Sequence, residues 1–250
     1  MGAFRALFKR RPTGWLKDPD DPRDLPLGAV VPSTPPASYL PHHGLSPLFQ
    51  VGNSCTGRIV QAVRIGEVNH RRPCPELSGL HNYYLSRHLW GGTGRDGGSY
   101  IRSAVQAVAK YGAAPASLWP ESVWKIQKRP NPLAQRKAHK FSGLRGYYRL
   151  NPADVDEVKR VIASGYAVFG GWRIDKAFLA SDGPSTIDAI SSSGLALGHA
   201  WLIDGYQSDG RFHMQNSWKN WRSTKYSQSG AWMTPAFVAQ ATDMWAIVID

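Results

Sequence analysis

Apolar side chains change their spacing along this chain. Between residue 41 and about residue 150 they recur every three or four positions, which is the spacing of helices that bury one face. The clearest of these helices begins at Ser99 and stops before Gly112, and its inward positions are Ile101, Ala104, Val105, Val108 and Ala109. Further helices are expected over 55–63, 77–88 and 151–165.

From Tyr166 onward the pattern changes to short β-type runs that clusters of Gly, Ser, Asp and Pro separate. These runs are 167–169, 200–203, 212–215 and 245–248. Helices followed by strands indicate an α+β fold. We expect a helical half over about 41–150 to pack against an antiparallel sheet or barrel over about 151–250, with the functional site between them.

Residues 1–40 are expected to form an extended arm, because proline fixes φ and removes a donor and the segment 17–24 is dense in proline and charge. Residues 1–12 are basic but lack the apolar run and cleavage site of a signal peptide. No apolar run approaches the roughly 20 residues of a membrane span. With only two cysteines, the chain is expected in a reducing, cytoplasmic compartment. We also expect a monomer.

The formal charge of +12 is partly local. Between Ser122 and Leu150 there is no carboxylate, and the cations are Lys125, Lys128, Arg129, Arg136, Lys137, Lys140, Arg145 and Arg149. We expect a solvated surface loop here. Binding of nucleic acid through Lys125–Arg149 is the alternative, although no recognised nucleic-acid motif accompanies the charge. An acidic protein substrate would also fit this charge.

Cys55, His199 and Asn216 have the chemistry of a nucleophilic-cysteine site. A thiol needs a base to become a thiolate, and the base needs a partner that orients it. Each of the three lies in a short segment, Gly52–Thr56, Gly198–Ala200 and Gln215–Trp218. We expect Cys55 in the first turn of a helix capped by Asn53 or Ser54, where the peptide dipoles favour the thiolate.

The remaining candidates for metal or thiol chemistry are weak. Cys74 lies between two prolines, has no obvious partner and is interpreted as an inert thiol. No spaced quartet of Cys and His suggests a zinc site. We therefore expect neither a metal nor a cofactor.

Several motifs occur in the order found in the papain-like (C1) cysteine peptidases, whose prokaryotic and phage-type branch the chain resembles. The resemblance runs from about Thr13 to the C-terminus. Its motifs are Gly14-Trp15-Leu16, Asn53-Ser54-Cys55-Thr56-Gly57, Asp96-Gly97-Gly98-Ser99, Ser117-Leu118-Trp119-Pro120, Gly198-His199-Ala200 and Asn216-Ser217-Trp218. Each motif is weak alone, and their shared order makes the signal.

The resemblance implies a role for each matched residue. Cys55 would be the nucleophile, His199 the base and later the acid, and Asn216 the group that orients the imidazole. Trp218 would cover that bond beside the substrate, and Gly97 and Gly98 would pair with an extended peptide.

The oxyanion donor is less regular, because the family's glutamine lies six positions before the cysteine. Phe49 occupies that position here, and Gln50 lies five before Cys55. Either Gln50 still points inward or the second donor is missing; we favour Gln50. The loop after Asn216 also departs from the family and carries three added cations, Lys219, Arg222 and Lys225.

The resemblance implies a cysteine-type peptidase that forms an acyl-enzyme and acts on protein or peptide substrates. Three other interpretations stay open. The chain is alternatively an inactive papain-like protein with a binding or structural role, a basic nucleic-acid-associated protein, or a cell-wall amidase with a Cys-His site. The Asn-Ser-Trp element at 216–218 argues against the amidase.

Overall fold

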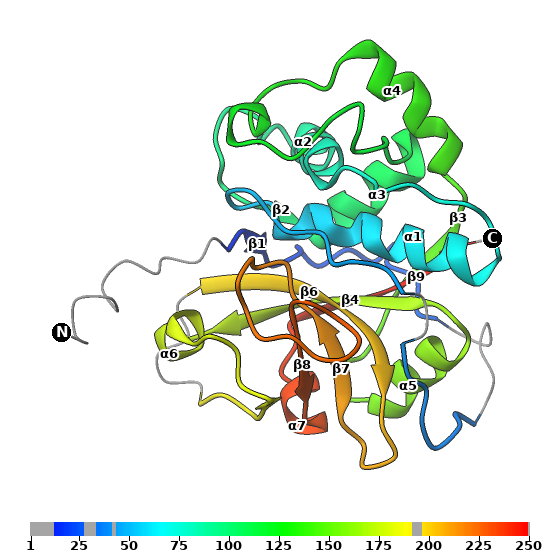
Figure 1. Cartoon of the computed structure of the whole chain (residues 1–250), viewed down its shortest axis with the longest axis vertical. Helices are drawn as coiled ribbons and strands as arrows, with labels where there is room; N and C mark the ends of the chain where they lie inside the picture. Colours follow the sequence, from blue (N-terminus) through cyan, green and yellow to red (C-terminus); the bar gives the residue numbers. More distant parts are fainter. Residues whose placement is uncertain (1–12, 28–33, 42–43, 192–196, 250) are drawn as a thin grey trace.

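The computed structural model describes residues 13–27, 34–41, 44–191 and 197–249. The basic segment 1–12 and residues 28–33 of the expected arm lie outside the described residues. Helices form most of the upper half of Figure 1, and a curved sheet forms most of the lower half. The predicted α+β fold is confirmed.

The upper half is built from short helices. They are η3 (Cys55–Ile59), α1 (Val60–Asn69), α2 (Gly79–Leu89), α3 (Ile101–Tyr111), η4 (Val123–Lys125), α4 (Pro132–Ala138) and η5 (His139–Phe141). Helix α3 buries the predicted face and ends at Gly112, whose φ of 72° belongs to the left-handed region that favours glycine. The expected solvated loop after Ser122 is wrong in part, because it contains α4, capped by the Asn131 side chain.

The lower half contains a seven-stranded sheet in the order β3-β9-β4-β6-β7-β8-β5. Its strands are β3 (Leu144–Arg149), β4 (Ala167–Ile174), β5 (Thr186–Ile187), β6 (Leu197–Tyr206), β7 (Phe212–Gln215), β8 (Gly230–Met233) and β9 (Asp243–Ile249). All neighbours are antiparallel except β5 and β8. The four predicted runs lie in β4, β6, β7 and β9, whereas β3, β5 and β8 were not predicted.

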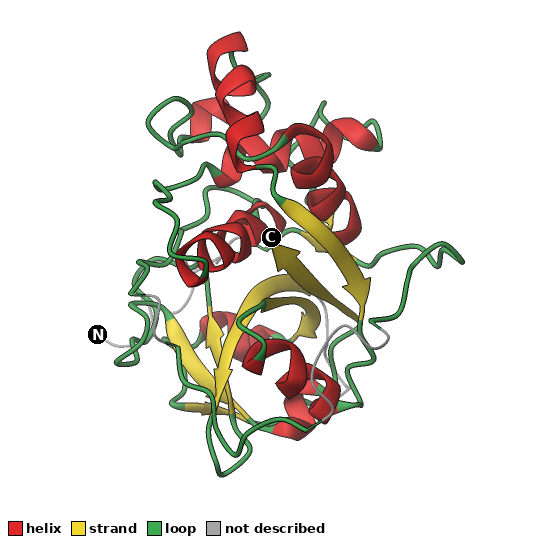
Figure 2. Ribbon diagram, turned by 90° about the vertical axis from the view of Figure 1, so that its right-hand side faces the viewer, coloured by secondary structure: helices red, strands yellow, loops and turns green. Residues whose placement is uncertain are grey.

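Helices lie on both sides of this sheet (Figure 2). Helix α1 contacts β4 and β9 on one face, and α5 (Val155–Ala163) contacts β4 and β6 on the other. Two short helices, α6 (Lys176–Ala180) and α7 (Pro235–Val238), complete the lower half. The two larger apolar clusters of the core therefore lie between α1, α3 and the sheet and beneath the sheet. A smaller cluster lies within the helical half, around Leu80, Tyr83 and Trp119.

The N-terminal arm crosses between the two halves (Figure 1). Its strand β1 (Trp15–Leu16) pairs in parallel with β2 (Ser99–Tyr100), just before α3. The described part of the arm has little further regular structure. It does not lie only on the outer surface, since Trp15 is 5% exposed. The arm thus fills the junction where the functional site was expected.

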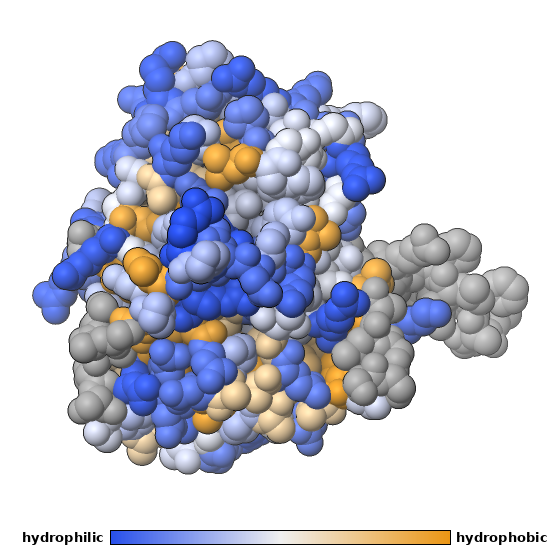
Figure 3. Space-filling view, turned by 180° about the vertical axis from the view of Figure 1, so that it is seen from behind, coloured by the Kyte–Doolittle hydropathy of each residue, from blue (hydrophilic) through white to orange (hydrophobic). Residues whose placement is uncertain are grey.

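The outer surface is mainly hydrophilic on the face seen in Figure 3, with small hydrophobic patches between charged side chains. Among the described residues, no helix has the length and apolar character needed to cross a membrane.

Candidate active site

Cys55 begins η3 at the junction of the two halves and is completely buried. The expected side-chain cap is wrong. The Ser54 side chain makes no cap hydrogen bond, and its Oγ instead accepts from the Val51 N–H and from the Arg58 guanidinium. Asn53 is turned toward Asp96, which accepts from its backbone N–H and its side-chain amide. Cys55 therefore sits at a helix N-terminus that backbone geometry alone defines.

Burial dominates the electrostatics of the thiol. Removal of water raises the pKa of Cys55 to about 12, although the N–H groups of Ala200 and Thr56 and the charge of Arg58 lower it. The Ala200 N–H belongs to the residue that follows His199, so the sulfur lies against the strand that carries the imidazole. In this arrangement the thiol is protonated at neutral pH.

His199 lies in β6, opposite Trp172 of β4, and is completely buried. Its Nε2 lies 2.9 Å from Asn216 Oδ1, and Trp218 stacks on the imidazole with centroids 4.4 Å apart and planes inclined by 9°. Burial lowers the pKa of His199 to about 4, against the opposing effect of the Asn216 hydrogen bond. The imidazole is therefore neutral.

The hydrogen bonds of Asn216 define which imidazole nitrogen carries the proton. Asn216 follows β7, and its Oδ1 also accepts from the Ser217 N–H at 2.7 Å, which identifies that atom as the oxygen. Nε2 of His199 must then donate, which leaves Nδ1 with a free lone pair. Nδ1 makes no hydrogen bond among the described residues. A buried imidazole with an unused basic nitrogen is suited to remove a proton from a neighbouring group.

Gln50 points inward beside the same segment. Its Oε1 accepts from Ser217 Oγ at 2.6 Å, and its backbone N–H donates to the Ser217 carbonyl at 2.8 Å. Its Nε2 donates to the carbonyl of Gly52 at 2.8 Å and to that of Thr13 at 3.2 Å. The side-chain amide thus lies in the loop before Cys55 and holds a carbonyl of the arm.

The arm is held on both sides of the junction. The Gly14 N–H donates to the Gly198 carbonyl at 3.1 Å, and the Ser99 N–H donates to the Gly14 carbonyl at 2.8 Å. A Cβ atom at Gly98 would overlap the Gly14 backbone. An extended chain segment therefore occupies the space between the glycine turn and the segment that carries His199.

The other predicted substrate-binding residues differ in placement. Gly98 lies against the arm, whereas Gly97 is exposed and its missing Cβ would meet only Arg95. Trp218, which lies beyond the end of β7, stacks on His199. Gly98 is thus the better placed of the two glycines for pairing with a chain.

Two residues of this junction were missed by sequence reasoning, Trp15 as a group inside the site and Asp243 at its base. Trp15 Nε1 donates to Asp243 Oδ2 at 2.9 Å. The apolar pair Trp15-Leu16 within a proline-rich, charged arm was a usable signal for a buried contact. Asp243 at the start of an apolar strand gave none. Among the described residues, no group of three or more His, Cys, Asp or Glu is placed to hold a metal ion.

Comparison with known proteins gives one sequence relative and several structural ones. No protein-family model matches the chain. An uncharacterized peptidase C1-like protein of Acanthamoeba polyphaga mimivirus is 26% identical over 211 residues, which cover 78% of this chain and 66% of that protein. The chain thus spans just under two thirds of that relative's length.

Solved structures share the fold over nearly the whole chain. Xylellain, a cysteine protease from Xylella fastidiosa, superposes with a TM-score of 0.80 at 22% identity, over 96% of this chain and 97% of that one. A digestive procathepsin L of Tenebrio molitor superposes with a TM-score of 0.70 at 17% identity, over 98% and 78% of the respective chains. The fold is papain-like, and the predicted resemblance to the C1 cysteine peptidases is confirmed.

Proposed function

We propose that this protein is a cysteine-type peptidase in which Cys55 is the nucleophile, His199 the acid-base and Asn216 the residue that orients the imidazole. The main observation that supports this proposal is the tautomer of His199. Its Nε2 is committed to Asn216, and Nδ1 keeps a lone pair while the next residue's N–H faces the Cys55 sulfur. A base and a thiol in this relation support nucleophilic catalysis.

The proposed reaction has two halves. His199 Nδ1 takes the proton of Cys55, and the sulfur attacks the peptide carbonyl carbon while the carbonyl electron pair moves onto oxygen. The imidazolium then protonates the leaving nitrogen as the C–N bond breaks, which leaves a thioester on Cys55. Water, deprotonated by His199, attacks the thioester and releases the acid and the thiol.

The negative oxygen of the intermediate needs fixed donors. We assign the backbone N–H of Cys55 and the Nε2 of Gln50 to this role. One contact supports the assignment: Gln50 Nε2 donates to the Thr13 carbonyl at 3.2 Å, so this amide is already bonded to the carbonyl of an extended chain segment. The Ser99 N–H and the Gly198 carbonyl would bind the substrate backbone as they bind Gly14. Gly98 would leave room for that backbone, because it has no Cβ.

The thiol and imidazole are both neutral while the arm lies over them, so the test requires the site to be opened. In a Trp15→Ala variant of the full chain, iodoacetamide should alkylate Cys55 faster than Cys74, the half-buried internal reference. Adding His199→Ala should slow labelling of Cys55 by about 10²–10⁴-fold. Peptide-library cleavage, with Cys55→Ala as control, then tests the hydrolytic half.

If Cys55 never reacts faster than Cys74, even with the arm loosened, the interpretation as an inactive papain-like protein replaces the peptidase. Nucleic-acid binding through Lys125–Arg149 stays a separate prediction. Within that stretch Arg149 is partly buried and pairs with Asp243 at 2.7 Å. A gel shift at low salt tests the remaining cations.

A further inference from the structure

The side chain of Trp15 fills a pocket at the junction of the two halves. The pocket is shaped by glycine, since a Cβ at Gly171 would overlap the indole ring and one at Gly198 would overlap both the ring and the Trp15 carbonyl. The indole N–H reaches Asp243 at the start of β9. The pocket thus combines room for a large flat ring with one buried acceptor.

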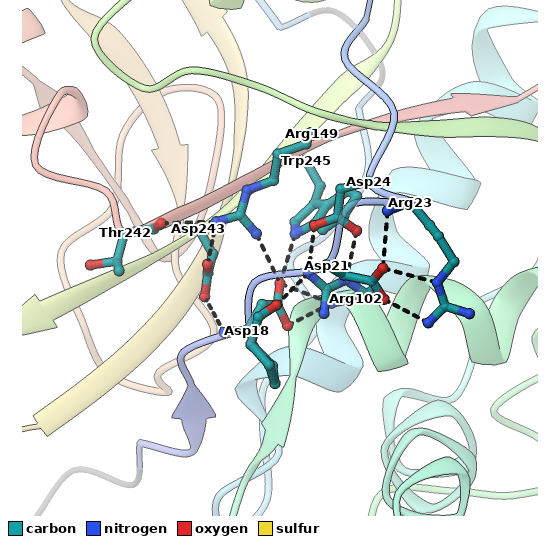
Figure 4. A network of polar contacts seen from close by, with 10 residues as sticks. Asp18, Asp21, Arg23, Asp24, Arg102, Arg149, Thr242, Asp243 and Trp245 are labelled. Carbon is teal, nitrogen blue, oxygen red and sulfur yellow. Dashed lines mark hydrogen bonds and ion pairs between the residues drawn. The ribbon is translucent and has the colours of Figure 1, made fainter.

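The two oxygens of Asp243 accept hydrogen bonds from different parts of the molecule (Figure 4). Oδ1 accepts from Arg149 Nη2 at 2.7 Å, a partner on the neighbouring strand β3. Oδ2 accepts from the Trp15 indole at 2.9 Å and from the Asp18 backbone N–H at 2.8 Å. Both hydrogen bonds that the described residues make to Oδ2 therefore come from the arm.

A peptide that takes the place of the arm must satisfy the same oxygen. Asp243 is 0% exposed, and an acceptor left buried without a donor loses its hydration without compensation. Arg149 already balances the charge of Asp243, so a second cation in the pocket would meet the guanidinium. The pocket accordingly favours a neutral donor on an apolar ring.

Resting on the proposed function, the geometry points to Asp243 as a specificity-determining residue that selects, in a peptide substrate, an aromatic side chain with an N–H donor. Tryptophan fits this description best, because it repeats the contact that Trp15 makes. Phenylalanine fills the ring space but offers Oδ2 no side-chain donor in place of the indole N–H. Arginine and lysine bring a charge that Arg149 opposes.

The first test measures the pocket without catalysis. In full-length Trp15→Ala, calorimetric titration with indole is compared with benzofuran, which has nearly the same shape but oxygen in place of N–H. Indole should bind about tenfold or more tightly. Wild-type protein, whose pocket Trp15 fills, is the control and should bind neither ligand there.

Asp243→Asn in the same background sharpens the test. Arg149 would donate to the side-chain oxygen of the new asparagine, so its NH₂ group would face the pocket. The protein should then bind benzofuran more tightly than indole. Equal affinities for the two rings, an indole preference that survives Asp243→Asn, or tighter binding of benzamidine would each overturn the proposal.

A second pair of variants covers the case in which Trp15→Ala misfolds. Trp15→Phe should lower the hydrogen-exchange protection of the Gly14 amide about tenfold with Asp243 present, and far less with Asp243→Asn. No coupling between the two changes would also overturn the proposal.

Peptide cleavage separates this inference from the proposed function. If peptides are cleaved, those with tryptophan at the pocket should be cleaved about tenfold faster than those with phenylalanine, and equal rates contradict the inference alone. If no peptide is cleaved while indole still binds through Asp243, the peptidase function fails and the pocket assignment stands.

Discussion

The candidate catalytic centre and the site that anchors the arm are both largely buried, yet they differ in how far their polar groups are hydrogen-bonded. The catalytic centre consists of Cys55, His199 and Asn216, and burial shifts the thiol and the imidazole toward their neutral forms. Two of its polar atoms, His199 Nδ1 and Asn216 Nδ2, make no hydrogen bond among the described residues. The centre thus holds two buried polar atoms without a hydrogen bond among the described residues.

The arm anchor, which we define as Asp18, Asp24, Arg102, Arg149 and Asp243, is densely paired (Figure 4). Arg102 Nε donates to Asp24 at 2.8 Å, and Asp18 accepts from the Trp245 indole at 2.9 Å. The guanidinium groups of Arg102 and Arg149 both lie over the Trp245 ring.

The contrast teaches where the binding energy of the arm resides. Near the candidate catalytic centre, the arm is held by backbone hydrogen bonds at Gly14. Further along, it is held by the ion pair between Asp24 and Arg102. Loosening the anchor should therefore raise reactivity at Cys55, and altering the centre should lower it without releasing the arm.

The largest effect is expected when the anchor is broken at Arg102. Arg102→Ala leaves Asp24 and the buried Asp18 without this cation, and loss of one partner of a buried pair costs about 3–5 kcal/mol. Arm docking should weaken about 10²–10³-fold, seen as faster hydrogen exchange at Gly14 and faster alkylation of Cys55.

The matched control is Arg23→Ala, which removes an ion pair within the arm whose cation is 87% exposed. Exposed pairs contribute little, so exchange at Gly14 should not change. Equal effects of the two substitutions would show that the buried anchor is not what holds the arm.

A smaller effect is expected in the centre for Asn216→Ala. The imidazole would lose the acceptor that fixes its tautomer, and such orienting partners are typically worth about 10–100-fold. The ratio kcat/KM for a peptide should fall by that amount in an arm-loosened background, while exchange at Gly14 stays unchanged. A fall in arm protection would mean that Asn216 supports the fold instead.

Docking of the arm is expected to depend on pH through Asp18. Burial, followed by the charge of Asp243, raises the pKa of Asp18 from its usual 3.8 to about 7, against hydrogen bonds from Trp245 and Arg102. The arm therefore takes up a proton when it docks. Its full affinity should be present below about pH 4 and be lost as the pH rises through about 7.

The slope of this dependence is at most one proton, or about tenfold in docking per pH unit. Burial also raises the pKa of Asp243, which acts in the same direction. Protection factors at Gly14, measured from pH 4 to 8 in wild type and Asp18→Asn, check the prediction. Tighter docking at higher pH in wild type would contradict it.

The smallest effect is expected for Trp218→Phe. Phenylalanine keeps a ring over His199 but lowers the area that shields the imidazole, so kcat/KM should fall only a few-fold, in line with about 0.5–1.5 kcal/mol for such contacts. Titration of His199 by NMR should show its pKa moving upward toward the usual value as water gains access. An unchanged pKa of His199 would mean that β6 alone excludes water from the imidazole.

Secondary structure was predicted correctly from the sequence where apolar spacing and backbone preference agree with the tertiary packing. The face of α3 and its end at Gly112 followed from apolar spacing and from the conformation that only glycine adopts easily. It failed at α4, whose sequence has Leu133 as its one large apolar residue and therefore shows no apolar stripe. It also failed at the cap of Cys55, because Asp96 draws Asn53 away through a contact 43 residues distant.

The sequence by itself determined the order of the elements, the papain-like resemblance and the identity of a thiol, an imidazole and a carboxamide suited to one reaction, since these depend on residue type and short-range spacing. Only the tertiary structure decided that the arm passes through the site, that Trp15 meets Asp243, and that the thiol and imidazole are neutral beneath it. Those features depend on which distant groups exclude water from one another, and the pairing of Trp15 with a residue 228 positions away leaves no trace in local pattern.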